Sequence, residues 1–303
     1  MRITRSVAAL GTTVSCATIA CSGLFTRQRE LTRPISAEAA TLAFVGDSDN
    51  RGRVGGAVYH GNGNAIVFDM TSGSQPAVTK LHVSHFSSAG WSAPLPAIPG
   101  FDVWHAGAQV SPDGTRLYFE STHRLQPVPG REDSDLWVAD RAADAWVNPR
   151  PLGPPFDSPD NEHNVTISAS GTICINSNRR GITAGHDILC SRRSASGWEA
   201  PRPLGAPVNG ASAEIAPFID PDERFLLFAS NRAGGAGMFD LYVSVYRDGE
   251  WQPAVNLGPR VNTPAAESNP ALSRDGRRLL FSRSSGDRAV PQEIRFDPRW
   301  LQH

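Results

Sequence analysis

The sequence has almost no net charge and none of the common catalytic signatures. Lysine and arginine total 29 against 30 aspartates and glutamates, so no overall field attracts nucleic acid or an anionic membrane surface. Beyond the first 25 residues, no apolar run approaches the length of a transmembrane helix. The chain also lacks G-x-S-x-G, H-E-x-x-H, a P-loop and a dinucleotide fingerprint. Motifs alone therefore assign no catalytic residue and no cofactor.

Glycine and proline, in contrast, are abundant. The chain has 28 glycines and 24 prolines, and only 19% of its residues are charged. This composition favours many short strands joined by tight turns over a helical bundle. A length of 303 residues suits one large all-β domain.

Residues 1–25 have the pattern of an export signal. A short basic head is followed by a stretch without charge from Ser6 to Ala20, too short and too rich in Ser and Thr to span a bilayer. The alternatives are a lipoprotein-type leader that leaves Cys21 lipidated, ordinary cleavage nearby, or an uncleaved leader. We expect an exported protein, in the periplasm or lipid-anchored to the outer membrane, with residues 26–40 as a linker.

An internal repeat organises the rest of the chain. Four tryptophans recur at intervals of about 53 residues, and Lys80 or an aspartate stands eleven residues before each. The tryptophans are Trp91, Trp146, Trp198 and Trp251. An apolar triplet lies further upstream in each unit, and Leu279-Leu280-Phe281 begins a fifth copy that ends near the C-terminus.

Each unit is predicted to form four short antiparallel strands. Turns such as Ser111-Pro112-Asp113-Gly114 supply the positive φ that a tight hairpin needs. Four-stranded units repeated radially are typical of a β-propeller, which we predict over residues 41–298 with five blades. The fifth copy has only three recognisable strands. We therefore expect the N-terminal strand 41–45 to complete it and close the ring.

Three segments carry a resemblance to a known family. They are Glu214 to Asp222, Phe228 to Arg232 and Asp240 to Val243. They resemble the WD40-like repeat of TolB and of periplasmic sensor-like proteins that couple such repeats to peptidoglycan-binding domains. The resemblance covers roughly residues 41–297. It implies a propeller of six blades, as in TolB. This chain has no room for a sixth copy, so either the ring has five blades or another chain supplies the rest.

Polar residues converge on one predicted channel mouth. In a propeller the first strand of each blade lines the channel, and three glutamates and a histidine share one register near the start of that strand. They are Glu162, Glu214, Glu267 and His105, with the neighbouring donors His163, Asn164 and Asn269. This set could bind a cationic or polyhydroxylated ligand or a divalent cation. Alternatively, each glutamate has a structural role common to all repeats, bonding a turn amide or the adjacent blade.

Two further pairs are predicted within blades. Arg179 and Arg232 lie close in register to Asp187 and Asp240, and we expect intrablade Arg–Asp pairs that position loops. Such exposed pairs contribute little to stability.

The cysteines Cys174 and Cys190 occupy packing positions on neighbouring strands of one unit. They are either two buried thiols or a disulfide formed in an oxidising compartment.

The functional hypothesis is a monomeric, envelope-associated binding module without a cofactor, holding a protein or glycan partner at the channel mouth. Nucleic acid is not expected as a partner, and membrane contact is expected only through the lipid. The alternative is a metal-assisted lyase or glycoside hydrolase that uses the channel carboxylates as acid and base.

Overall fold

The structure is a computed structural model of the chain. It describes residues 40–41, 53–60, 63–72, 77–123, 134–156, 158, 162–179, 185–286 and 288–302. All of these belong to one unit, residues 33–303. The predicted export signal, Cys21 and residues 42–45 lie outside the described residues. None of the helical turns in the described part is long and apolar enough to cross a bilayer.

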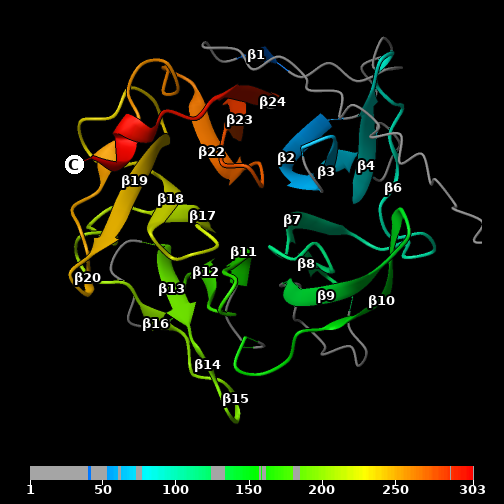
Figure 1. Cartoon of the computed structure of the whole chain (residues 1–303), viewed down its shortest axis with the longest axis horizontal. Helices are drawn as coiled ribbons and strands as arrows, with labels where there is room; N and C mark the ends of the chain where they lie inside the picture. Colours follow the sequence, from blue (N-terminus) through cyan, green and yellow to red (C-terminus); the bar gives the residue numbers. More distant parts are fainter. Residues whose placement is uncertain are drawn as a thin grey trace, which may run out of the picture. The chain divides into compact units, whose positions relative to one another are not determined.

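Five antiparallel sheets surround one axis and form a five-bladed β-propeller, as predicted (Figure 1). Blade 1 comprises β2 (Arg53–His60), β3 (Ala65–Thr71), β4 (Thr79–Ser87), β5 (Gly90–Trp91) and β6 (Leu95–Pro96). Blade 2 comprises β7 (His105–Val110), β8 (Arg116–Ser121), β9 (Asp135–Ala142) and β10 (Ala145–Pro151). Blade 3 comprises β11 (Glu162–Ile167), β12 (Ile173–Ser177), β13 (Asp187–Ser191) and β16 (Arg202–Pro203).

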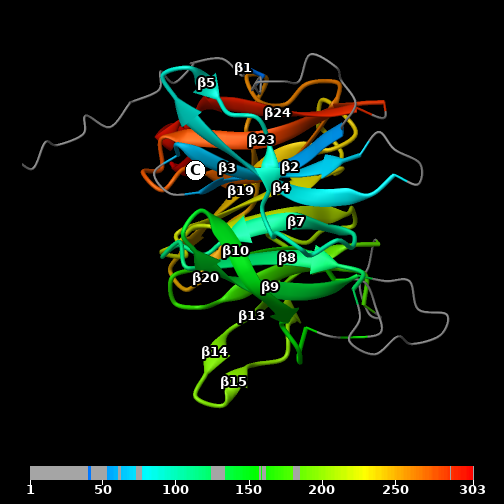
Figure 2. The ribbon, with the colours of Figure 1, turned by 90° about the vertical axis from the view of Figure 1, so that its right-hand side faces the viewer.

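The other two blades follow the same plan. Blade 4 comprises β17 (Glu214–Ile219), β18 (Phe225–Ser230), β19 (Asp240–Arg247), β20 (Glu250–Trp251) and β21 (Val255–Asn256). Blade 5 comprises β22 (Ala266–Leu272), β23 (Arg278–Ser285), β24 (Arg288–Arg295) and β1 (Ala40–Thr41), and a 3-10 turn, η2 (Pro298–Leu301), follows it. A small hairpin of β14 (Arg193–Ser194) and β15 (Gly197–Trp198) projects from blade 3 (Figure 2).

The apolar triplets form the second strand of each blade and make up the core. All six residues of β18 are buried, because neighbouring blades cover both faces of each sheet. Strands buried on both faces are apolar throughout instead of alternating. The triplet Ile66, Val67 and Phe68 of β3 is likewise fully buried.

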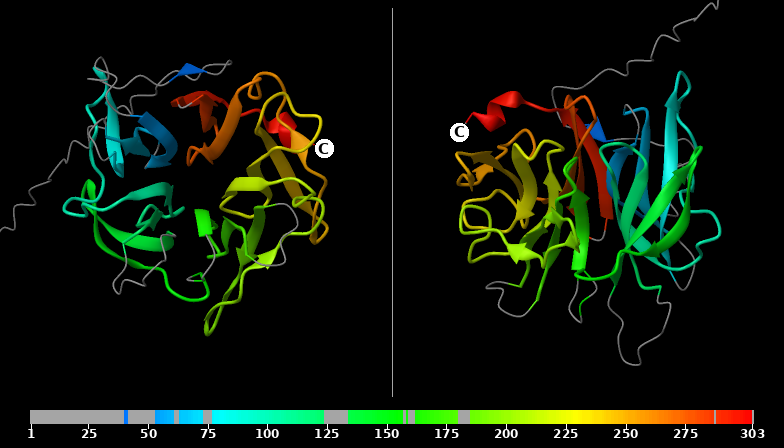
Figure 3. Two further views of the ribbon diagram at one scale, coloured as in Figure 1. Left: turned by 180° about the vertical axis from the view of Figure 1, so that it is seen from behind. Right: turned by 60° about the horizontal axis from the view of Figure 1, so that its bottom comes forward.

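The ring closes between the two ends of the described chain. Ala40 and Thr41 of β1 pair with Glu293 and Gln292 of β24, which confirms that an N-terminal strand completes the last blade. The first and last blades lie side by side in the rear view of Figure 3. Glu293 of β24 also accepts a hydrogen bond of 2.6 Å from the Tyr59 hydroxyl of blade 1. This contact ties the last blade to the first.

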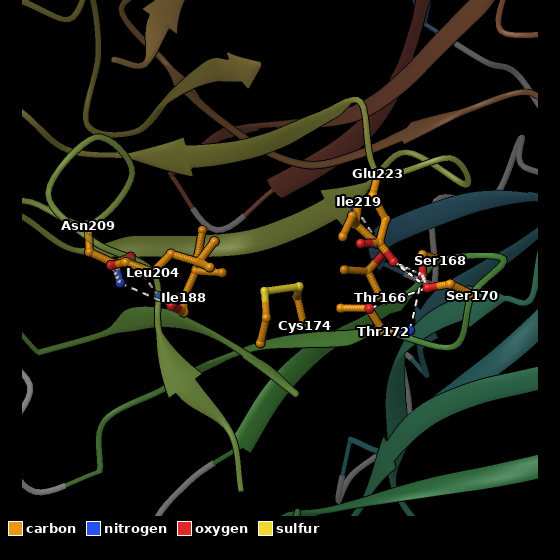
Figure 4. The surroundings of a disulfide bond; sticks show 11 residues. Thr166, Ser168, Ser170, Thr172, Cys174, Ile188, Leu204, Asn209, Ile219 and Glu223 are labelled. Carbon is orange, nitrogen blue, oxygen red and sulfur yellow. Dashed lines mark hydrogen bonds between the residues drawn. A yellow bond between two sulfur atoms is a disulfide. The ribbon is translucent and has the colours of Figure 1, made fainter. Parts of the chain in front are cut away.

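The structure resolves the alternative left open for the cysteines. Cys174 and Cys190 are directly opposite each other on β12 and β13 and form a disulfide (Figure 4). The bond joins the second and third strands of blade 3, at a position where blades 1, 2 and 4 pair two largely apolar residues. It closes a loop with a sequence separation of 16 residues.

Replacing both cysteines by alanine is expected to lower the free energy of unfolding by about 3 kcal/mol, the loop-entropy value for a closed loop of this length. Chemical denaturation of native and variant proteins measures the change. A reducing agent should destabilise the native protein by a similar amount and leave the variant unaffected. Equal denaturation midpoints for the native and variant proteins would show that the disulfide contributes nothing.

Candidate functional site

The three predicted glutamates are fully buried in ion pairs. Each lies near the start of an inner strand with no solvent exposure. An arginine from the second half of the second strand of the same blade, or just after that strand, donates to its Oε1. The pairs are Arg179 Nε to Glu162 at 2.9 Å, Arg232 Nη2 to Glu214 at 3.0 Å and Arg283 Nε to Glu267 at 2.8 Å. We call these three pairs the Glu–Arg clamps.

Each clamp also binds the segment that enters its blade. Arg232 donates to the Val208 carbonyl at 2.6 Å, and Gly210 N donates to Glu214 Oε2 at 2.9 Å. In blade 5, Thr263 N donates to Glu267 at 3.0 Å. The clamps thus join an inner strand, a second strand and an incoming linker. This geometry supports the structural alternative for the glutamates, because each carboxylate is bonded to an arginine through Oε1 and shielded from solvent.

The predicted Arg–Asp pairs were wrong. Arg179 and Arg232 turn inward to the buried glutamates, since an uncompensated carboxylate in the interior would be costly. Asp240 instead accepts hydrogen bonds from Ala236 N at 2.6 Å and Gly237 N at 3.0 Å. It positions the loop without an arginine.

His105 occupies the glutamate register in blade 2 but does not face the mouth. It is 1% exposed and lies among the rings of Phe101 and Phe119. Its Nδ1 is 2.7 Å from the Val103 carbonyl. Burial lowers the pKa of His105 to about 4, so the imidazole is neutral at physiological pH and packs as part of the aromatic core.

A bulge interrupts every inner strand at the same place. In all five blades, the register of the inner strand against the second strand shifts between the second and fifth residues, counted from the position that holds the glutamate in blades 3 to 5. In four blades the residue that begins the bulge has a φ of 50° to 65°: Gly107, Asn164, Ala216 and Asn269. These are left-handed conformations that favour Gly and Asn.

Side chains from the preceding blade fix three of these bulges. Asp69 of blade 1 accepts from Gly107 N at 3.0 Å, Glu120 of blade 2 accepts from Asn164 N at 2.8 Å, and Asn176 of blade 3 accepts from Ala216 N at 3.0 Å. Each acceptor directly follows an apolar triplet. These polar bonds set the spacing of neighbouring inner strands around the channel.

Asp69 and Glu120 are site residues that the sequence reasoning missed. Burial, reinforced by the nearby Glu120 carboxylate, raises the pKa of Asp69 to about 7. A side-chain Cβ at Gly107 would collide with Glu120 Oε1, so any larger residue there would force the Glu120 side chain to move. The sequence did contain a signal for them, because each acid stands immediately after an apolar triplet, one ending at Phe68 and the other at Phe119.

The remaining predicted residues gather at the end of the channel where the inner strands begin, which we call the strand-start mouth. His163 Nδ1 lies 2.8 Å from Glu120 Oε2, and the imidazole is 32% exposed. The hydrogen bond that the Glu120 carboxylate accepts from the imidazole raises the pKa of His163. Asn164 Nδ2 reaches Asn269 Oδ1 across the channel at 3.4 Å. Here a partly exposed imidazole and two amides offer donors and acceptors together.

The channel itself is narrow. The cavity lined by the bulge residues has a volume of about 30 Å³, room for a water molecule or two. A ligand at the strand-start mouth must therefore lie over the channel and not inside it. At the other mouth, the Asp-Gly turns line a cavity of about 290 Å³ with exposed charges of both signs.

The part of the chain that the structure describes contains no group of three His, Cys, Asp or Glu side chains placed to hold a metal ion. The donors at the strand-start mouth are an imidazole and amides, and the clamped glutamates are shielded from it. The described arrangement is suited to hydrogen bonding of a polar ligand.

Comparison with known proteins shows the fold alone. No family model matches the sequence, and no curated protein matches it. Among solved structures, the chain is similar to a glycoside hydrolase (TM-score 0.60, 8% identity, 88% of this chain and 92% of that one). It is also similar to an α-L-arabinofuranosidase from Podospora anserina (TM-score 0.54, 11% identity, 87% and 98%).

TolB from Acinetobacter baumannii aligns with a TM-score of 0.47 and 11% identity over 81% of this chain. The alignment spans 55% of that TolB chain. At these identities, similarity of architecture does not transfer an activity.

Proposed function

We propose that this chain is a binding module of the bacterial envelope, which holds a protein or glycan partner over the strand-start mouth. The observation that supports this is the pairing of His163 with Glu120 beside the amides of Asn164 and Asn269. Below its raised pKa, His163 is an imidazolium held by a carboxylate, and it offers a charged donor next to two neutral amides. Export of the chain, with or without a lipid on Cys21, belongs to the same proposal.

The enzymatic alternative has less support. It requires carboxylates that can exchange protons with a substrate, and Glu162, Glu214 and Glu267 are buried and bonded to arginines. Asp69 and Glu120 hold bulge amides instead. A binding role requires no change in the arrangement of side chains at the strand-start mouth.

The bulge conformation allows a test that removes the amides without straining the backbone. Asn164 and Asn269 have left-handed φ values, so the double variant Asn164→Gly/Asn269→Gly keeps a conformation that glycine prefers. Immobilised protein is incubated with solubilised envelope proteins and, separately, with peptidoglycan sacculi. We expect recovery of the bound partner to fall at least ten-fold (roughly 1.4 kcal/mol or more), with little change in melting temperature.

Ala216→Gly is the matched control, because it makes the same substitution at the equivalent bulge without removing a polar group. It should bind like the native protein. Mass spectrometry of the mature N-terminus of the same material reports on export and on Cys21. Equal recovery by native and double-variant proteins would refute the mouth as the site, and metal-dependent turnover of a polysaccharide would favour the enzyme.

A further inference from the structure

A second cavity lies away from the channel, between blades 3 and 4. Its volume is about 330 Å³, which is within the range of about 300–1,000 Å³ typical of small-molecule sites. Cys190 of the disulfide, Leu204 and Ile219 contribute apolar surface. Figure 4 shows this neighbourhood, with the disulfide next to the strand that carries Ile219. We call it the blade 3–4 groove.

Two aromatic rings form one side of the groove. Tyr246 and Trp251 lie on β19 and β20, with ring centroids 5.1 Å apart and an interplanar angle of 61°. Tyr246 is 36% exposed, one of the few large hydrophobic side chains that the described part of the chain leaves exposed. This edge-to-face pair leaves Tyr246 partly open to solvent at the groove.

An unusual backbone conformation places an acid in the groove. In blades 2, 3 and 5, the inner hairpin turn has glycine at its left-handed position: Gly114, Gly171 and Gly276. The equivalent residue of blade 4 is Glu223, with a φ of 59°. Its amide donates to the carbonyl three residues earlier, Asp220 O, at 2.8 Å, as the glycines do in their turns. A non-glycine residue in this conformation is strained, and such strain is concentrated at functional sites.

The Glu223 side chain is also oriented. The hydroxyls of Ser168 and Ser170 in blade 3 both donate to Glu223 Oε1, as Figure 4 shows. Despite its partial burial, these hydroxyls and a neighbouring threonine hydroxyl lower the pKa of Glu223, so it is ionised at neutral pH. A carboxylate has about four acceptor positions; both serines bond Oε1, and Glu223 lines the groove.

The charges of the groove are balanced. Glu199 and Glu223 are matched by Arg192 and Arg202, so the lining favours neither an anionic nor a cationic ligand. Guanidinium donors and carboxylate acceptors suit vicinal hydroxyls, and aromatic faces suit the apolar face of a pyranose ring. We propose that the blade 3–4 groove binds a neutral oligosaccharide, with Tyr246 and Trp251 as the stacking surface and Glu223 as a hydroxyl acceptor.

This site is independent of the strand-start mouth and shares no residue with it. The experiment is saturation-transfer NMR of the whole protein with two neutral probes, cellotetraose and chitotetraose, followed by titration. We expect saturable binding of at least one probe. Glu223→Gly and Tyr246→Ser should each weaken it at least ten-fold.

Glu223→Gly restores the glycine that three other blades have at this turn, so the backbone of the variant is unstrained. The matched controls are Asp222→Asn in the same turn and Met238→Ser, an exposed apolar residue outside the groove, and both should bind like the native protein. Absence of binding by both probes would overturn the proposal. So would native affinity in Glu223→Gly and Tyr246→Ser, even if Glu223→Gly lowers the melting temperature, because Glu223 would then serve only to join the two blades.

Discussion

Replacing Glu214 by glutamine is expected to lower the free energy of unfolding by about 3–5 kcal/mol, the usual consequence of removing one partner from a buried ion pair. Glu214 has no solvent exposure and accepts hydrogen bonds from Arg232, Gly210 and Ser230. An amide group can replace only one of the two oxygens as an acceptor. Arg232 would then keep its charge without a full partner, in contact with the rings of Phe228 and Tyr242.

Urea denaturation of the native protein and of Glu214→Gln measures this change. The control is Glu250→Gln, an exposed glutamate of the same blade, for which we expect an unchanged midpoint. Removing both charges, in Glu214→Gln/Arg232→Gln, should restore part of the loss because no unpaired cation remains. If Glu214→Gln instead keeps the native midpoint and loses partner binding, the glutamate is a ligand contact and not part of a clamp.

The second large effect is expected at the closure of the ring. Glu293 is 4% exposed and accepts from the Tyr59 hydroxyl at 2.6 Å and from Arg278 Nη1 at 3.1 Å. Glu293→Gln should cost about 3–5 kcal/mol by the same reasoning. Because Tyr59 belongs to blade 1 and Glu293 to blade 5, the loss should also increase hydrogen exchange in β1 and β24 more than in the central blades.

Denaturation and hydrogen-exchange mass spectrometry test both parts of this prediction. Asp140→Asn is a suitable control, because the pair of Asp140 with Arg150 is well exposed and exposed pairs contribute little. A stable Glu293→Gln protein with unchanged exchange in β1 would show that strand pairing alone holds the ring together.

The architecture could be predicted from the sequence because the same pattern of strands and turns recurs five times. The apolar triplets, the Asp-Gly turns and the spacing of Trp91 to Trp251 define strands, turns and register. Even the closing strand followed from counting, since the fifth copy has three recognisable strands and Ala40 and Thr41 supply the fourth.

The chemistry of the site was less accessible to sequence reasoning. Register placed Glu162, Glu214 and Glu267 correctly near the starts of inner strands, but register alone does not tell a buried ion pair from an open carboxylate. The arginines that pair with them stand 16 to 18 residues later, and their direction depends on side-chain conformation.

The acceptors of the bulge amides were missed for another reason. Asp69 and Glu120 bond residues of the next blade, and a repeat compared position by position shows contacts within a unit more readily than contacts between units. Glu223 was missed too, although its replacement of a turn glycine was visible in the sequence.

The closing strand also bears on how the protein acquires its structure. Ala40 pairs with Glu293, so the first described strand, β1, finds its partner in β24, the last strand of the ring. Because a chain is synthesised from its N-terminus, β1 has no partner until β24 has been made. Contacts so distant in the chain carry a large loop-closure entropy and slow folding. Closure of the ring therefore comes late in folding, and a chain truncated before β24 would leave β1 without its partner.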